Sequence, residues 1–446
     1  MKVLLGICIM ATRSGAELFV RDLALGLNSR GHSVVVYSPI IGDMIEELRQ
    51  QSIACVADLE SVTVAPDIII GNTQIETVLC LARFPGVPAI SICHDRVAEH
   101  GRPPRFSRIG AHVAVDANCA ERLTLEHGIA PAQISIIQNG VDLRRFRPRS
   151  PLPERPRAAA IFSNYATHGV ETESVRCACA AEGVALEVVG MRAGNQSTAP
   201  EEILHRYDLI FAKARCAIEA MAVGCAVVVL NESLGMAGMV TSANVADWRL
   251  WNFGRRLLAR NPIDEARVRN AIRSYSSADA ALVSAYIRNH ASLDSTVVAL
   301  EELALDILQT RAEPIPPERE LQEFARYVHG FLLASGPTRI AHQVGMLQQA
   351  VQQARAREQN ATERAGMLHQ AVEQARAREQ EATESARRAA AHARAAEKAL
   401  LIAREKLARS RRKVAAIRAS YSWRATAPFR WLRKRVVLLR EQRDEA

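Results

Sequence analysis

The sequence predicts an α/β protein in which two doubly wound domains are followed by a long helical extension. Two observations carry this prediction. Short apolar runs rich in Val and Ile alternate with helical patterns up to about residue 310, as expected for buried parallel strands joined by crossover helices. From residue 344 the composition shifts to Ala, Gln, Glu and Arg, and apolar residues recur with heptad spacing up to residue 419.

The first alternating region, residues 1–150, predicts a Rossmann-like domain. Its expected strands are the runs VLLGICIM, SVVVYSP, DIIIGN, VPAISICHD, AHVAVDA and ISIIQNG, which begin at residues 3, 33, 67, 87, 111 and 134. A Gly-containing loop follows the first run, and an amphipathic helix is expected from about Ala16 to Ser29. The Pro-rich stretch 147–156 is expected to be a hinge.

The second alternating region, residues 151–310, predicts a smaller domain of the same type. Its strand candidates are RAAAIFSNY, VALEVVG, YDLIFAK and CAVVVLNE, which begin at residues 157, 184, 207 and 225. A helix is expected over 214–224. Two such domains joined by a short hinge leave a cleft between facing strand ends, and ligands of open α/β sheets bind at such ends.

The extension divides into a helical linker (311–343), a coiled coil (344–419) and a basic amphipathic tail (420–446). A 21-residue repeat begins at Met346 and again at Met367, and 21 residues are three heptads. Ala predominates in the expected seam, and Glu358 and Glu379 occupy a positions. A seam of this length gains burial only against a partner, which predicts a homo-oligomer; the alternative is a solitary solvated helix.

The charge distribution excludes one class of partner and suggests another. Residues 401–446 hold 14 Lys/Arg against 4 Asp/Glu, a net +10, whereas the whole chain carries +9, so the first 400 residues sum to −1. The basic charge therefore belongs to the tail, and no base-stacking face with interleaved basic residues is found, which argues against nucleic acid. Trp423, Phe429 and Trp431 lie among these basic residues. This mixture predicts contact with an anionic membrane surface; the alternative is a coiled-coil end cap.

The cysteines and the apolar runs indicate a cytoplasmic protein. All nine cysteines lie between Cys8 and Cys225, without a CxxC pair, which favours a reducing compartment without disulfides. No run of 18 apolar residues occurs, so no membrane-spanning helix is expected. The protein is expected in the cytoplasm, with the tail at the inner face of the membrane.

Three stretches could carry chemistry. Gly15 stands where the first strand gives way to a helix, so backbone N–H groups there could approach a phosphate or sugar; a packing glycine explains it equally well. In QNGVDLRRFRP, Asn139 and Gly140 predict a turn with positive φ, and Asp142 begins the entry into the hinge, which could be a domain crossover and nothing more.

The third stretch is KARCAIEAMAVGCAVVVLNE, which begins at residue 213. Lys213 and Arg215 stand at a helix start, where cations beside free N–H groups form an anion pocket. Glu219 lies one turn further on and could accept hydrogen bonds from a ribose diol. No Asp-x-Asp or His/Cys cluster with metal-ligand spacing accompanies them, so no metal and no cofactor are expected.

Three motifs together resemble those of glycosyltransferase family 4, a retaining family with the GT-B fold. They are SGAE (14–17), NGVD followed by Phe146 and Pro148, and EAMAVGCAV (219–227). The resemblance covers about residues 1–310 and implies transfer of a sugar from a nucleotide-diphosphate donor to a glycan or lipid-linked acceptor, without a metal. It implies that Glu219 holds the ribose. His94 matches the histidine that members place beside the transferred sugar; the alternative is an ordinary histidine at a strand end.

The chain departs from the family pattern at two places. The family usually has a second Glu eight positions before Glu219, where this chain has Phe211. The Arg and Lys usual after the first strand of the second domain are replaced by IFSNYATHG, and Lys213 with Arg215 could supply the lost charge. Two alternatives follow: a catalytically silent domain that binds a nucleotide sugar or glycan and organises enzymes through the coiled coil, and an enzyme of the same fold with another reaction, such as a nucleotide-sugar epimerase.

Overall fold

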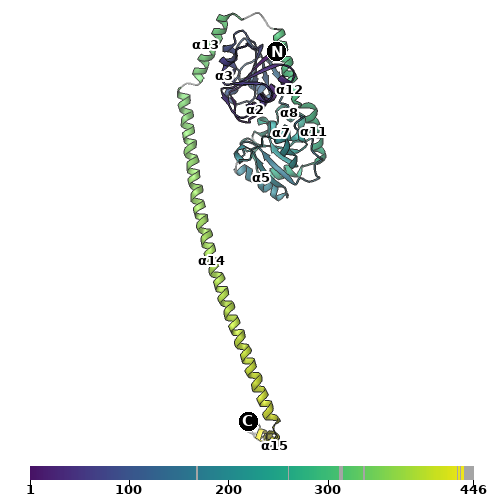
Figure 1. Ribbon diagram of the computed structural model, residues 1–446, viewed down its shortest axis with the longest axis vertical. Helices are drawn as coiled ribbons and strands as arrows, with labels where there is room; N and C mark the ends of the chain where they lie inside the picture. Colours follow the sequence, from purple (N-terminus) through teal and green to yellow (C-terminus); the bar gives the residue numbers. More distant parts are fainter. Residues whose placement is uncertain are drawn as a thin grey trace, which may run out of the picture. The chain divides into compact units, whose positions relative to one another are not determined.

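The computed structural model describes residues 1–166, 169–259, 261–310, 315–334, 337–428, 430–431 and 433–435. For 333–334, most of 337–364, 421 and 423 it describes the backbone alone. The chain forms two compact units, Met1–Ala334 and Ser335–Ala446. The first unit contains two large sheets with flanking helices and a small two-stranded sheet, and the second unit is dominated by one helix (Figure 1).

The first sheet has seven parallel strands in the order β5-β3-β1-β6-β7-β8-β9. Their bounds are β1 Lys2–Gly6, β3 Ser33–Tyr37, β5 Ala54–Val56, β6 Ile68–Gly71, β7 Ala89–Cys93, β8 Ile109–Ala114 and β9 Ile134–Ile136. The helices between them are α1 Gly15–Ser29, α2 Ile45–Arg49, α3 Gln74–Arg83 and α4 Ala117–Glu121. The strand order reverses direction beside β1, which is the doubly wound arrangement predicted from the sequence.

One predicted strand is divided in two. The run from residue 3 to 10 was expected to be continuous, but β1 ends at Gly6 and β2 Ile9–Met10 pairs with β4 Ile40–Ile41 in a separate two-stranded sheet. Strand β2 follows β1 and β4 follows β3, and β1 and β3 are neighbours in the main sheet. The chain therefore leaves the main sheet after both strands at the same edge.

The second sheet has five strands in the order β11-β10-β12-β13-β14, parallel except for the last pair. The strands are β10 Ala158–Phe162, β11 Ala185–Val189, β12 Leu209–Ala212, β13 Ala226–Asn231 and β14 Gly235–Met239. The helices are α5 Val170–Ala181, α6 Pro200–Ile203, α7 Ala214–Val223, α8 Val245–Leu250, α9 Arg255–Leu258, α10 Glu265–Arg273 and α11 Ser277–His290. The antiparallel strand β14 was not predicted, because GMAGM has neither β-branched residues nor alternation.

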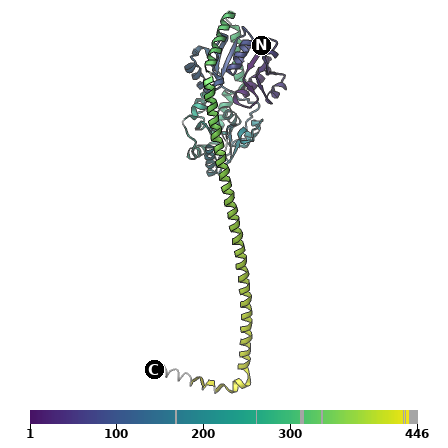
Figure 2. The ribbon, with the colours of Figure 1, turned by 90° about the vertical axis from the view of Figure 1, so that its left-hand side faces the viewer.

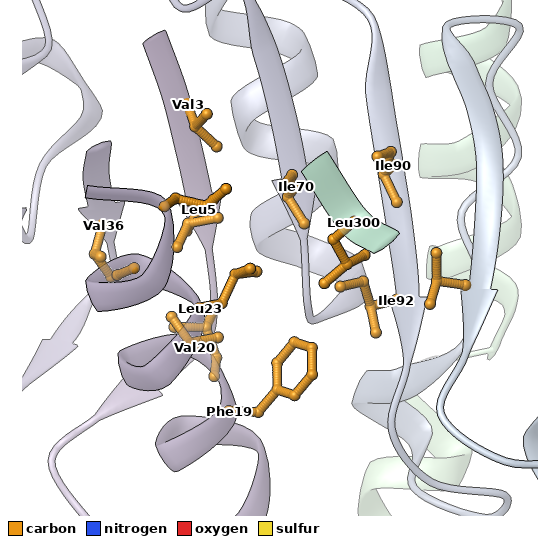
Figure 3. Close-up of a cluster of buried hydrophobic side chains, with 14 of the residues drawn as sticks. Val3, Leu5, Phe19, Val20, Leu23, Val36, Ile70, Ile90, Ile92 and Leu300 are labelled. Carbon is orange, nitrogen blue, oxygen red and sulfur yellow. The ribbon is translucent and has the colours of Figure 1, made fainter. Parts of the chain in front are cut away.

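The next helix, α12 Leu293–Gln309, packs on the first sheet although the sequence analysis placed residues up to 310 in the second domain. Val297 and Leu300 are buried in the core that β1, β6, β7 and α1 form. Figure 3 places Leu300 beside Ile92 and near the side chains of β1 and α1. The helix therefore returns to the first domain because its apolar face completes that domain's core.

Helix α13 Pro317–Ala334 also packs on the first domain, within the stretch expected to be a linker. The Glu320 carboxylate lies 2.9 Å from the guanidinium of Arg108, and both side chains are largely buried. The ring centroids of Phe106 and Phe324 are 4.8 Å apart. An ion pair and an aromatic contact thus hold this helix against the first sheet.

The second unit contains α14 Pro337–Ala419, a helix of 83 residues, and the short α15 Tyr421–Ala425. Figure 2 shows α14 as one uninterrupted helix. Every side chain of α14 that is described from residue 365 to 419 is exposed or nearly so. The predicted helix is confirmed; its pairing into a coiled coil remains a prediction. None of the described helices is long and apolar enough to cross a membrane.

Candidate functional site

A cleft of about 550 Å³ lies between the two sheets. Residues from both domains line it, and most follow the carboxyl ends of parallel strands: Asp95 after β7, Ser163 after β10, Gly190 after β11 and Lys213 after β12. This is where open α/β sheets bind their ligands. Of the residues that the sequence singled out, Gly15, His94, Lys213, Arg215 and Glu219 all line the cleft.

The wall from the first domain begins at the N-terminus of α1. The Glu17 carboxylate accepts hydrogen bonds from the Thr12 hydroxyl at 2.8 Å and from the Ser14 backbone N–H at 3.3 Å, which ties the preceding loop to the first helical turn. Gly15 lies between these residues, and a Cβ added there would meet no atom within 4 Å. Gly15 therefore faces open space rather than a packed neighbour, which weakens the reading of it as a packing glycine.

The wall from the second domain is the N-terminus of α7. Lys213 is the residue before this helix, and Ala214 adopts a φ of 48°, an uncommon conformation for a residue with a Cβ. The Ala214 N–H donates to the carbonyl of Phe253, itself at a φ of 49°. Burial lowers the pKa of Lys213, and nearby Arg255 lowers it further. Within the described part of the chain Lys213 makes no ion pair, which leaves its charge available to an anion.

Arg215 lies between two buried carboxylates. Its Nε donates to Glu219 Oε1 at 2.7 Å, and its Nη2 donates to Asp22 of α1, across the cleft. Burial alone would lower the pKa of Arg215, but the Asp22 and Glu219 carboxylates raise it above its ordinary value. Burial would likewise raise the pKa of Asp22, yet Arg215 and Arg21 together hold it below its ordinary value. The arginine is therefore neutralised by protein groups and joins the two domains.

Glu219 is 4% exposed and borders the cleft. Burial raises the pKa of its carboxyl group, and Arg215 opposes that rise. One oxygen is taken by Arg215, and no donor among the described residues reaches the other. That second oxygen is free to accept a hydrogen bond from a ligand.

His94 follows β7 and lies on the first-domain side of the cleft. Its Nε2 is 2.9 Å from Asn72 Oδ1, and its ring meets Phe19 edge-on, with centroids 4.8 Å apart. Because an amide oxygen accepts, Nε2 carries the proton and Nδ1 remains as an acceptor. Burial, and then the charge of nearby His100, lower the pKa of His94 to about 4, so the ring is neutral at pH 7.

This depressed pKa predicts a pH dependence of stability. His94 titrates at about 4 in the folded chain, against an ordinary value of 6.5, so between those values the unfolded chain binds a proton that the folded chain does not. Stability should be full above pH 6.5 and fall toward pH 4, by up to about 3 kcal/mol from this residue. In urea titrations at pH 7 and pH 4, His94→Gln should lose that much less than the parent chain. The exposed His205→Gln is the control, and equal losses in all three chains would contradict the assignment.

The crossover residues lie outside the cleft and act on its lining. Asp142 Oδ1 accepts from the backbone N–H groups of Arg144 (2.9 Å) and Arg145 (3.3 Å), which forms an Asx turn. Arg145 and Phe146, which follow, do line the cleft. The motif therefore positions cleft residues and does not itself face a ligand.

The expectation of a positive φ at this Asn-Gly turn was wrong. Gly140 has no positive φ; instead, a Cβ there would lie 2.6 Å from the Cα of Leu293. The next residue hydrogen-bonds the same segment, because Val141 N–H donates to the Ala291 carbonyl and Leu293 N–H donates to the Val141 carbonyl. Asn139 accepts through its carbonyl from the guanidinium of Arg249. Glycine is needed here for close approach to the start of α12.

The sequence of this first domain matches a known family. Residues 13–145 match the sequence model described as Glycosyltransferase Family 4. No curated protein sequence matches the chain significantly.

Solved structures similar to this chain agree on the fold. Anabaena Alr3699/HepE, solved in complex with UDP and glucose, aligns with a TM-score of 0.50 at 16% identity, over 69% of this chain and all of that one. A glycosyltransferase from Rickettsia africae aligns with a TM-score of 0.46 at 13% identity, over 70% of this chain and 99% of that one. The predicted GT-B fold is confirmed.

The family-4 pattern of paired Glu residues is interrupted for a structural reason. Phe211 lies in β12 with its side chain fully buried in the core of the second sheet. Only Lys213 separates β12 from α7, so no loop exists between them that could carry a second carboxylate toward the cleft. The chain therefore presents one Glu where the family pattern expects two.

One group beside the cleft and one in its lining were not anticipated from the sequence. Asp22 lies on α1, buried beside Arg215, and reads in the sequence as a helix surface residue. Arg145 forms a two-pronged ion pair with Glu201, at 2.9 Å to each oxygen. Both pairs join residues more than 50 positions apart, and no local pattern indicates such a pairing.

Proposed function

We propose that this glycosyltransferase-family protein is an active, retaining enzyme that moves a sugar from a nucleotide-diphosphate donor to a glycan or lipid-linked glycan. Such reactions serve the biosynthesis of bacterial-type surface polysaccharide or cell envelope. The observation that carries the proposal is the meeting of Lys213, the N-terminus of α7 and Glu219 in one cleft. A cation beside free helix N–H groups suits a diphosphate, and a carboxylate one turn away suits a ribose.

The donor would be divided between these groups. Lys213 carries the charge that the described residues leave unpaired, so it is the group we assign to the diphosphate. The free oxygen of Glu219 would accept from the ribose diol. Arg215 would act indirectly, because its charge is already shared between Glu219 and Asp22, and its part is to hold Glu219 in place.

His94 would face the transferred sugar. A neutral ring whose Nε2–H is held by Asn72 offers Nδ1 as an acceptor to a sugar hydroxyl. A charged imidazolium could only donate, and burial disfavours that form. The hydrogen bond to Asn72 and the contact with Phe19 fix the orientation of the ring.

The reaction is proposed to need no metal, because protein cations and helix N–H groups can take the charge of the leaving nucleotide diphosphate. The placement of Lys213 at the start of α7, in the lining of the cleft, supports this.

A panel of nucleotide sugars tests the proposal. The full chain is incubated with each donor in EDTA, and mass spectrometry follows release of the free nucleotide. We expect at least one donor to be consumed at an undiminished rate in EDTA. Turnover that is lost in EDTA and restored by manganese would contradict the metal-free mechanism.

A second candidate is a catalytically silent domain that binds a nucleotide sugar or glycan. The missing carboxylate before α7 favours it, because the buried Phe211 takes that position. The same panel separates the two functions. Calorimetric binding of a donor that is never consumed, with any acceptor glycan supplied, would favour the silent domain.

The tail is proposed to bring the enzyme to an anionic membrane surface at the cytoplasmic side. Trp431 is 59% exposed, and the Arg435 guanidinium lies over its ring at 4.8 Å. Phe429, Leu432 and residues 436–446 lie outside the described residues, as does the side chain of Trp423. An exposed Trp among basic residues is the pattern of interfacial segments.

Neutralising the tail should weaken this attachment. Arg433→Gln with Lys434→Gln removes two charges, each worth about 1 kcal/mol at an anionic surface, so affinity should fall about 30-fold at low salt. Sedimentation with vesicles of phosphatidylserine and phosphatidylcholine measures it, with pure phosphatidylcholine vesicles as the control. Arg387→Gln with Arg388→Gln, which removes two exposed charges in the middle of α14, should leave binding unchanged. Equal binding of all variants would contradict the membrane contact and would indicate that the aromatic residues of the tail cap the end of a coiled coil.

A further inference from the structure

Helix α14 exposes an apolar stripe along its length. At the heptad a and d positions of the part with described side chains, the large exposed residues are Leu368, Val372, Leu400, Leu407, Val414 and Ile417. A helix of 83 residues that leaves this stripe in water gains nothing from it, whereas a partner helix would bury it. The charges beside the stripe indicate which partner.

Two a positions carry a charge, Glu358 and Glu379. Glu379 interrupts the stripe, and Arg378 directly before it occupies the flanking g position. Neither side chain makes an ion pair within the part of the chain that the structure describes. The same dipeptide, Arg357-Glu358, stands 21 residues earlier in the sequence, at the same heptad positions. A carboxylate in a helix seam is costly unless an opposite charge reaches it from the partner.

We propose that the partner is a second copy of this chain, parallel and in register. In a parallel coiled coil each a residue packs into a hole that includes the partner's preceding g residue. Arg378 of each copy then lies beside Glu379 of the other, and the earlier Arg-Glu dipeptide repeats the arrangement. In an antiparallel pair, a residue can lie opposite the same residue of the other chain at only one level along the helix. The two Arg-Glu dipeptides therefore cannot both lie opposite the same dipeptide of the other chain.

The flanking residues agree with this register over most of the helix. In a parallel pair each g residue faces the e residue five positions later on the partner. Arg378 then faces Thr383, Ala371 faces Arg376, and His392 faces Glu397. From residue 371 to 404 the g and e positions join no two like charges in this register. At the a level the two Glu379 carboxylates face each other, and each has Arg378 of the other copy beside it.

Among the g and e positions, like charges meet only in the last two heptads, where Lys406 faces Arg411 and Lys413 faces Arg418. This end adjoins the basic tail. Its repulsion is screened by salt or relieved by an anionic surface, so it does not oppose pairing in the remainder of the helix.

A parallel pair places both tails at the same end. Two basic tails can then act on one surface, which raises the avidity without any new contact. An antiparallel pair would separate the tails by the length of the helix, about 125 Å at 1.5 Å per residue. This consequence rests on the proposed membrane contact of the tail, whereas the pairing does not.

Cysteine cross-linking of the full chain tests the pairing. Ala382→Cys and Ala403→Cys each place a thiol at a d position, in a chain whose exposed Cys177 is replaced by Ser. Under mild oxidation we expect both variants to form disulfide-linked dimers, because equal d positions meet at every level of a parallel pair in register. Glu384→Cys, two residues further on the outer face, should not cross-link. If only one variant cross-links, the pair is antiparallel. If neither variant cross-links, the chain is a monomer or binds another partner. Either result overturns the proposal.

A charge exchange tests the basis of the register. Arg378→Glu should weaken self-association about tenfold in sedimentation equilibrium, since it turns two attractive contacts into repulsive ones. Adding Glu379→Arg to this variant reverses both charges and should restore the affinity of the parent chain. Unchanged association in the single variant, or no recovery in the double variant, would overturn the role of these residues. Neither measurement uses a donor sugar or a membrane, so it stands apart from the proposed function.

Discussion

Replacing Lys213 with glutamate is expected to abolish nucleotide-sugar binding. The lysine lines the cleft at the N-terminus of α7 without an ion pair among the described residues, so a diphosphate there has its charge-assisted contact mainly from this group. Removing such a contact costs about 1.5–3 kcal/mol, and reversing the charge adds repulsion of similar size. Affinity should therefore fall by about 100-fold or more.

Calorimetry with the donor that the panel identifies measures this change. Lys213→Arg keeps the charge and should retain most of the affinity. Arg13 also lines the cleft but is paired with Glu47, so Arg13→Gln should lower the affinity less than Lys213→Glu. Undiminished affinity in Lys213→Glu would place the diphosphate elsewhere in the cleft.

Replacing Arg215 with alanine is expected to destabilise the fold rather than simply weaken donor binding. The change leaves Asp22 and Glu219 buried without their shared cation, and loss of one partner from a buried ionic group costs about 3–5 kcal/mol. Urea unfolding measures the cost. The exposed pair Arg144–Asp294 supplies the control, since Arg144→Ala should change stability by less than about 1 kcal/mol.

The effect of Arg215→Ala should also depend on pH. Without the guanidinium, burial raises the pKa of Glu219 further, and the pKa of Asp22 rises from its lowered value although Arg21 still faces it. The penalty is therefore present at pH 7 and shrinks as the pH falls and these carboxyl groups take up protons. A cost that stays constant from pH 7 to pH 4.5 would show that the two carboxylates are not its source.

These two expectations separate residues that the sequence alone placed together. Lys213 and Arg215 stand two positions apart at one helix start, and both read as anion-binding cations. The distinction is tertiary: Asp22 comes from α1 of the other domain and neutralises one of them. The charge of a side chain is written in the sequence, but its availability depends on which distant groups fold against it.

The sequence by itself determined the two doubly wound domains, the start of α1 near residue 16, helix α7 and the length of the helical extension. These features depend on local patterns, namely apolar runs for buried strands and 3.6- or 3.5-residue periodicity for helices, which neighbouring residues carry. The cleft residues Gly15, His94 and Lys213 could be named for the same reason, since each stands at a strand or helix end. Glu219 lies inside α7 and could be named from the EAMAVG motif.

Only the tertiary structure decided how these parts meet. It placed α12 and α13 on the first sheet, replaced an expected turn at Gly140 by close contact with α12, and joined Arg215 to Asp22 of the other domain. Each of these outcomes depends on contacts between residues tens or hundreds of positions apart. Such contacts follow from the packing of whole elements, and no local run of sequence encodes them.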